Sequence, residues 1–205
     1  MRRLGVDAQR TSRRRSADAA HALRAAAGAA ALGALAMLSA CASSAPLRYY
    51  TLSQIPAASE AATTGGATLR VGRVRVPGEL DRNEIVQRID ATRLKIAEQD
   101  RWAAPLDEMI RRVLSADLQA RGPASGAPST LSLDVEEFIG DAACGVTLRA
   151  SWELRSAADN DTPVRTGYES IQVPPSSGTC TVGALPMAMS QALAQLSERI
   201  LAATR

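Results

Sequence analysis

The sequence predicts an α+β domain in which a mostly antiparallel sheet packs against two main amphipathic helices. Three observations support this fold class. Several short segments alternate apolar and polar side chains, which is the period of a half-buried strand. Two longer segments repeat apolar residues at helical spacing. The strands come in runs with the helices segregated from them, which favours α+β over an alternating α/β fold.

The first 40 residues have the composition of a signal peptide. Several arginines precede an uncharged, alanine-rich stretch at 25–40. This stretch is short compared with the roughly 20 apolar residues that span a bilayer. It ends in "LSAC", residues 38–41, which resembles the lipobox of bacterial lipoproteins. That resemblance implies that Cys41 begins the mature chain and carries a covalent lipid.

The residue after Cys41 is Ala42 and not Asp, which by analogy with enterobacterial sorting favours the outer membrane, facing the periplasm. The alternative is an ordinary cleavable signal in which Cys41 only lies near the cut. We therefore expect a signal peptide at 1–40, a lipidated tether at 41–46 and one domain at 47–205.

Composition excludes several classes of function. Residues 1–40 hold seven of the 24 basic residues and two of the 21 acidic ones, which leaves 17 basic and 19 acidic residues and a net charge of −2. Charge therefore gives no argument for nucleic-acid binding. The only histidine, His21, lies in the signal segment, so histidine-dependent catalysis and zinc binding are not expected. We expect no enzyme, no metal and no cofactor other than the lipid on Cys41.

The first half of the domain contains strand signals. Residues 47–52, "LRYYTL", have strand composition, and 54–68 are small and polar, as in a flexible loop. Residues 69–80 contain the next strand, which Pro77-Gly78 ends as a turn. In it Val71 falls out of phase with Val74 across Gly72, which indicates a bulge.

Residues 84–89 and 93–99 flank "DAT" and predict a hairpin. A short helix capped by Asp81, with Glu84 three residues later, is the alternative for the first half of this segment.

The second half alternates helix and strand signals. A helix follows Pro105, and "GP" at 122–123 ends it. Strands are expected at 130–138, 146–155 and 164–173, the last two as an antiparallel hairpin centred near Asp159. A second helix closes the chain. The predicted buried faces of the two helices are Leu106, Met109, Ile110, Val113, Leu114 and Leu118, and Leu185, Met189, Leu193, Leu196 and Ile200.

Two cysteines remain after Cys41. Cys144 precedes one strand of the hairpin and Cys180 follows the other, so a modest loop would bring them together. In an oxidising compartment such a pair forms a disulfide. Two buried thiols are the alternative.

Several segments in this order resemble the PqiC-type family of ABC-transport auxiliary lipoproteins. They are the lipobox, "RYYTL", "VGRVRVPGELDRNEIVQRI" and "RWAAPLDEMIRRVLSADL", followed by strands and a C-terminal helix. The resemblance implies an outer-membrane lipoprotein that works with an MCE-domain protein anchored in the inner membrane. It implies a non-catalytic docking subunit of a lipid transport system that supports envelope integrity, with a ring-like homo-oligomer as one possible form. A lipoprotein that assembles or plugs an outer-membrane β-barrel is the alternative.

Five residues are candidates for partner binding. Trp102 suits an interface anchor, although packing beneath the following helix is the preferred interpretation. Tyr49 and Tyr50 suit a membrane interface, although strand alternation predicts that one is exposed and one lies in the core. Arg111 and Arg112 lie on the polar face of the first helix, where a solvated surface is the alternative to an acidic partner or lipid headgroups.

Overall fold

The computed structural model describes residues 45–56, 69–121, 128–156, 163–175 and 179–204. Cys41, the predicted signal peptide and most of the predicted loop at 54–68 lie outside the described residues. Residues from Pro46 onward form one structural unit. Its elements are β1 Arg48–Tyr50, β2 Leu69–Arg75, β3 Glu84–Arg88, β4 Leu94–Trp102, α2 Leu106–Arg121, β5 Ser129–Asp141, β6 Val146–Ser156, β7 Pro163–Val173, the 3-10 turn η2 Val182–Ala184 and α3 Leu185–Thr204.

The seven strands form one mixed sheet in the order β1-β4-β3-β5-β6-β7, with β2 also paired to β5. The predicted α+β class is confirmed, but the prediction of a mostly antiparallel sheet is only partly right. The pairs β3–β4, β5–β6 and β6–β7 are antiparallel, whereas β1–β4, β2–β5 and β3–β5 are parallel. Parallel strands need a long crossover connection, because the chain must return to the same end of the sheet before the second strand starts. Between β2 and β5 the β3–β4 hairpin and α2 provide this connection.

The strand β2 has the bulge that its sequence predicts. Val71 pairs with Leu131 and Val74 with Leu133, so two residues of β2 oppose one residue of β5. A Cβ atom on Gly72 would lie 2.7 Å from Thr130 Cγ2, so glycine permits the close approach of the strands here. The strand ends at Arg75, just before the turn that Pro77-Gly78 predicts.

Strands β3 and β4 form the predicted antiparallel hairpin, and the alternative helix from Asp81 is not present. The Asp90 carboxylate closes the turn, because Oδ1 accepts hydrogen bonds from the backbone N–H groups of Thr92 and Arg93. An aspartate that bonds to the backbone two or three residues later favours a turn over a helix.

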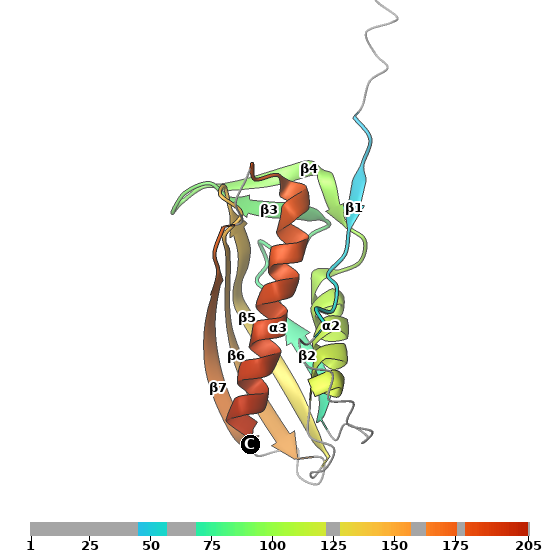
Figure 1. Cartoon of the computed structure of the whole chain (residues 1–205), viewed down its shortest axis with the longest axis vertical. Coiled ribbons are helices and arrows are strands. Elements are labelled where there is room, and N and C mark those ends of the chain that lie inside the picture. The colour runs from blue at the N-terminus through green and yellow to red at the C-terminus, as the bar shows by residue number, and fades with distance from the viewer. Residues whose placement is uncertain (1–44, 57–68, 122–127, 157–162, 176–178, 205) are drawn as a thin grey trace, which may run out of the picture. The chain divides into compact units, whose positions relative to one another are not determined.

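Both helices cover the same face of the sheet (Figure 1). Helix α3 packs on β5, β6 and β7, and α2 packs on β2 and on α3. All eleven apolar positions predicted for the helices are buried. On β6 the residues that face the helices are buried, and those between them are more exposed, as expected for a sheet with one covered face. Among the described residues, neither helix is long and apolar enough to cross a membrane.

Candidate functional site

A groove of about 750 Å³ lies along the outer edge of β4. One wall consists of residues 95–100 of β4. The other consists of residues 181–183, at and just before η2. Arg48 and Tyr50 of β1 also line the groove, at the end where β1 pairs with β4.

The β4 edge is open because β1 is short. β1 pairs only with residues 100–102 of β4, while β3 occupies the opposite edge. In the described part of the chain, no strand pairs with the outer edge of residues 95–99. Pro46 lies two residues before β1, and because proline has no N–H group it cannot extend the ladder in that direction.

An ion pair holds β1 at the end of the groove. Arg48 Nε donates to Asp100 Oδ1 at 2.7 Å, and Arg48 Nη2 donates to Asp100 Oδ2 at 2.9 Å. Asp100 is only 5% exposed. The hydrogen bond from Arg48 is the main reason that the pKa of the Asp100 carboxyl lies below its usual value. A buried carboxylate held by a bidentate guanidinium fixes the position of β1.

Tyr50 connects this ion pair to the second wall. Burial, followed by a hydrogen bond to Asp100, raises the pKa of the Tyr50 phenol. A Cβ atom on Gly183 would lie 2.9 Å from the Tyr50 hydroxyl oxygen. Glycine at position 183 therefore lets the phenol reach η2.

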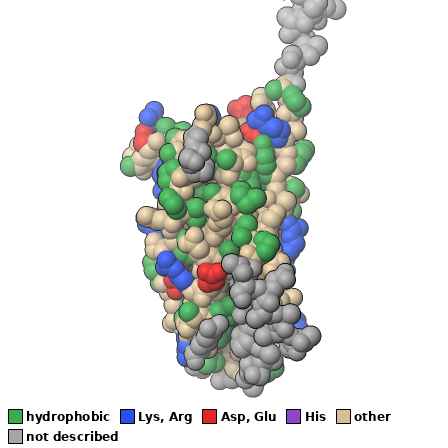
Figure 2. Space-filling model, in the orientation of Figure 1, with side chains coloured by type: hydrophobic (Ala, Val, Ile, Leu, Met, Phe, Trp, Pro, Cys, Tyr) green, Lys and Arg blue, Asp and Glu red, His purple; other side chains and the backbone are tan. Residues whose placement is uncertain are grey.

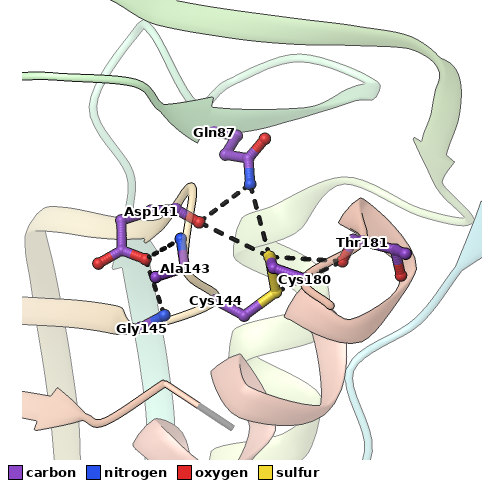
Figure 3. The surroundings of a disulfide bond; sticks show 7 residues. All are labelled: Gln87, Asp141, Ala143, Cys144, Gly145, Cys180 and Thr181. Carbon is purple, nitrogen blue, oxygen red and sulfur yellow. Dashed lines mark hydrogen bonds between the residues drawn. A yellow bond between two sulfur atoms is a disulfide. The ribbon is translucent and has the colours of Figure 1, made fainter. Parts of the chain in front are cut away.

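A disulfide supports the second wall (Figure 3). Cys144 and Cys180 are bonded, with their Cα atoms 5.4 Å apart. Cys180 directly precedes the residues of the wall, and Cys144 lies in the turn between β5 and β6. In that turn the Asp141 Oδ1 atom accepts the N–H groups of Ala143 and Gly145. The disulfide therefore ties η2 to a turn that is itself held by hydrogen bonds.

Gln87 of β3 adds a third connection at this position. Its side chain is 7% exposed, and Nε2 donates to the Asp141 carbonyl oxygen at 2.9 Å and contacts Cys180 Sγ at 3.9 Å. The β3–β4 hairpin, the β5–β6 turn and the segment before α3 thus meet at one point (Figure 3).

Trp102, Tyr49 and Tyr50, three of the predicted partner-binding residues, differ in how far they are buried. Trp102 ends β4 and is 5% exposed as part of the core, which corresponds to the packing interpretation and leaves the indole little surface for a partner. Tyr49 is 63% exposed and Tyr50 is half-buried against the core, as strand alternation predicts. Only Tyr50 lines the groove.

Arg111 and Arg112 are exposed on α2 and do not line the groove. Arg112 Nη2 donates to Thr51 Oγ1 at 2.8 Å, which attaches α2 to the segment after β1. The sequence signalled neither the open edge of β4 nor the approach of η2. A charged residue, Asp100, at an inward position of a strand is the one local sign of the site.

In Figure 2 charged side chains lie at the end of the molecule that carries β1 and β4 and also along its sides, and hydrophobic ones are scattered over the face that carries α3. Among the described residues, no group of three or more histidine, cysteine, aspartate or glutamate side chains is placed to hold a metal ion. The groove presents the backbone of β4, the ion pair between exposed Arg48 and buried Asp100, and both charged and apolar side chains.

Solved structures share this α+β fold. A crystal structure of an uncharacterized protein superposes with a TM-score of 0.59 at 22% identity, over 78% of this chain and all of the other. A crystal structure of a protein from Xanthomonas campestris superposes with a TM-score of 0.57 at 20% identity, over 75% of this chain and 91% of the other. These similarities show the fold class.

The family follows from the sequence match. The model of the ABC-type transport auxiliary lipoprotein component family matches residues 50–201, from the end of β1 almost to the end of α3. The chain belongs to this family, of the PqiC type that the sequence motifs resemble. It is 31% identical over 115 residues to the intermembrane transport lipoprotein PqiC of Escherichia coli K12 and, equally, of Shigella flexneri. The match spans 62% of the length of those relatives and 52% of this chain.

Proposed function

We propose that this protein is a lipoprotein of the outer membrane, anchored through Cys41 on the periplasmic face. It serves there as a non-catalytic docking subunit of an MCE/ABC-type intermembrane lipid transport system. The observation that carries the proposal is the family match over residues 50–201, because that family consists of auxiliary lipoprotein components of ABC-type transport.

The names of two similar proteins also support a role in intermembrane transport. The relatives from Escherichia coli and Shigella flexneri are intermembrane transport lipoproteins. The lipobox-like "LSAC" at 38–41 supplies the lipid anchor that such a role requires. An auxiliary subunit binds and positions other components, and this role needs no catalytic side chains.

The groove beside β4 supports a docking role. It has one wall of strand edge and a second wall fixed by the Cys144–Cys180 disulfide. A firmly supported groove at an open sheet edge suits recognition of another protein.

The test is a cross-linked pull-down of the full, lipidated chain from bacterial membranes in mild detergent, followed by identification of the recovered proteins. The proposal predicts an MCE-domain protein together with its permease and ATPase. Recovery of an outer-membrane β-barrel in place of an MCE-domain protein would instead support the assembly or plug function. Recovery of neither would refute the docking role.

A further inference from the structure

The open part of the β4 edge is as long as a short strand. Residues 94–97 pair with β3 in regular register, and residues 98–100 bulge before the pairing resumes at Arg101. All of them belong to β4, so residues 95–99 form an edge that contains a bulge and is as long as the shorter strands of proteins. Their outer edge lies in the groove, and no strand of the described residues pairs with it. An exposed strand edge presents N–H and C=O groups that are complementary to the backbone of another extended segment.

The side chains of the groove also suit a polypeptide. The four charged residues of its lining, Arg48, Lys95, Glu98 and Asp100, comprise two bases and two acids, so the lining has no net charge. A balanced lining favours an uncharged backbone over a strongly anionic or cationic ligand. Ile96 is 42% exposed and can contact alternate side chains of an added strand.

The other end of the sheet is less suited to strand addition. The β7 edge begins at Pro163 and is followed by Pro174 and Pro175, and prolines protect sheet edges. Arg199 of α3 donates to the Ser170 carbonyl oxygen and so occupies one acceptor of β7. At β4, by contrast, η2 supplies a second wall that holds an incoming segment from the other side.

We infer that the groove binds an extended segment of a partner protein, which adds to the sheet as a new strand along residues 95–99 of β4. Backbone hydrogen bonds to β4 provide the affinity, and contacts with Ile96 and η2 select the side chains. The inference gives the proposed function its docking site, and it rests on that function only for the identity of the partner.

The experiment measures binding of synthetic peptides to the purified full chain in mild detergent. The probes are acetylated, amidated octapeptides that alternate threonine with valine, isoleucine or phenylalanine. Each has an analogue N-methylated along one edge, which keeps the side chains but removes the backbone donors. Fluorescence anisotropy gives the affinity, and amide hydrogen exchange maps the binding site.

At least one octapeptide should bind saturably and protect the amides of residues 95–99. N-methylation should weaken binding by about tenfold or more, because strand addition depends on its backbone hydrogen bonds. Thr181→Trp fills the groove from an exposed position and should weaken binding similarly. Thr166→Trp, on exposed β7, is the matched control and should not change it.

A second groove variant, Glu98→Trp, keeps the test decisive if Thr181→Trp fails to fold. The inference is overturned if no octapeptide binds, if the N-methylated analogues bind equally well, or if protection maps to β7. It is also overturned if the groove variants change only self-association, since the occupant is then a second copy.

The two proposals can fail separately. If peptides bind at β4 but the pull-down recovers no MCE-domain protein, the proposed function is wrong and the groove remains a peptide site. If an MCE-domain protein is recovered equally with the wild type and with Thr181→Trp, the proposed function stands and the docking site is wrong.

Discussion

Arg48 and the buried Asp100 form a two-point ion pair that joins β1 to β4 at the end of the groove, with distances of 2.7 and 2.9 Å. β1 is only three residues long and therefore makes few ladder hydrogen bonds. The ion pair compensates for this short ladder and fixes the point at which β1 begins and the open edge of β4 ends.

The ion pair predicts a pH dependence of stability. The pKa of Asp100 is lower in the folded state than its ordinary value of 3.8, chiefly through Arg48. The unfolded state therefore binds more protons in acid, and the stabilisation is present above about pH 4 and lost as the pH falls further. The free energy of unfolding, measured with urea between about pH 6 and pH 2.5, should fall less steeply for Asp100→Asn than for the wild type. Equal slopes would contradict this role of Asp100.

Removal of the disulfide should destabilise the domain substantially. Cys144 and Cys180 close a loop with a sequence separation of 36. On the chain-entropy estimate, the double variant Cys144→Ser/Cys180→Ser should lose about 3–4 kcal/mol in the free energy of unfolding. A reductant should destabilise the wild type by a similar amount and leave the double variant unchanged. If the reductant has no effect on the wild type, the disulfide has no such role.

Gly167 should tolerate no side chain, because Trp152 lies against it. A Cβ atom at this position would lie 2.4 Å from Trp152 Cζ2, and Trp152 is 2% exposed. Gly167→Ala should cost about 1–3 kcal/mol by overpacking. Gly78→Ala is the control, since no atom lies within 4 Å of its Cβ position, and it should change stability by less than about 0.5 kcal/mol. Similar values for both variants in thermal or urea unfolding would refute this account.

Two methionines test the assignment of the core. Met109 of α2 is fully buried, whereas Met187 of α3 is 57% exposed. Met109→Ala should cost about 2–5 kcal/mol, because it removes buried methylene groups and leaves a cavity. Met187→Ala should have an effect of less than about 0.5 kcal/mol. Urea unfolding of the two variants measures the difference, and a larger loss for Met187→Ala would contradict the packing described.

Cys41→Ser should abolish lipid attachment and membrane retention and leave the domain folded. The reason is that the lipobox resemblance makes the Cys41 thiol the point of lipid attachment. Incorporation of a labelled fatty acid and fractionation of membranes measure the effect, and circular dichroism monitors the fold. Unchanged membrane retention of the variant would refute lipidation at Cys41.

The elements defined by local patterns could be predicted from the sequence. The buried faces of both helices follow from apolar spacing, and the bulge at Gly72 follows from a break in alternation. The β6–β7 hairpin was also predicted from alternation in two adjacent segments, with its centre near Asp159. The observed pair Val146–Val173 centres the hairpin between residues 159 and 160. In each case the signal lies within one segment or two adjacent ones.

The sheet topology and the groove could not be predicted in this way. The parallel pairs β1–β4 and β2–β5 join segments far apart in the chain, and alternation within a strand does not identify its neighbour. The groove depends on where β1 starts and on how the disulfide places η2. Both are long-range relationships, so the sequence indicated neither the pairing of Arg48 with Asp100 nor the role of residues 181–183, although Asp100 is a charged residue at an inward position of a strand.

The most direct test of the account places a photo-cross-linking amino acid in the groove of the lipidated chain in its native membranes. Position 99 lines the groove on β4, and position 166 on β7 is the control. If β4 docks the partner, position 99 forms a cross-link to an MCE-domain protein and position 166 does not. A cross-link from position 99 to a different class of protein, or an MCE-domain cross-link from position 166 alone, would contradict it.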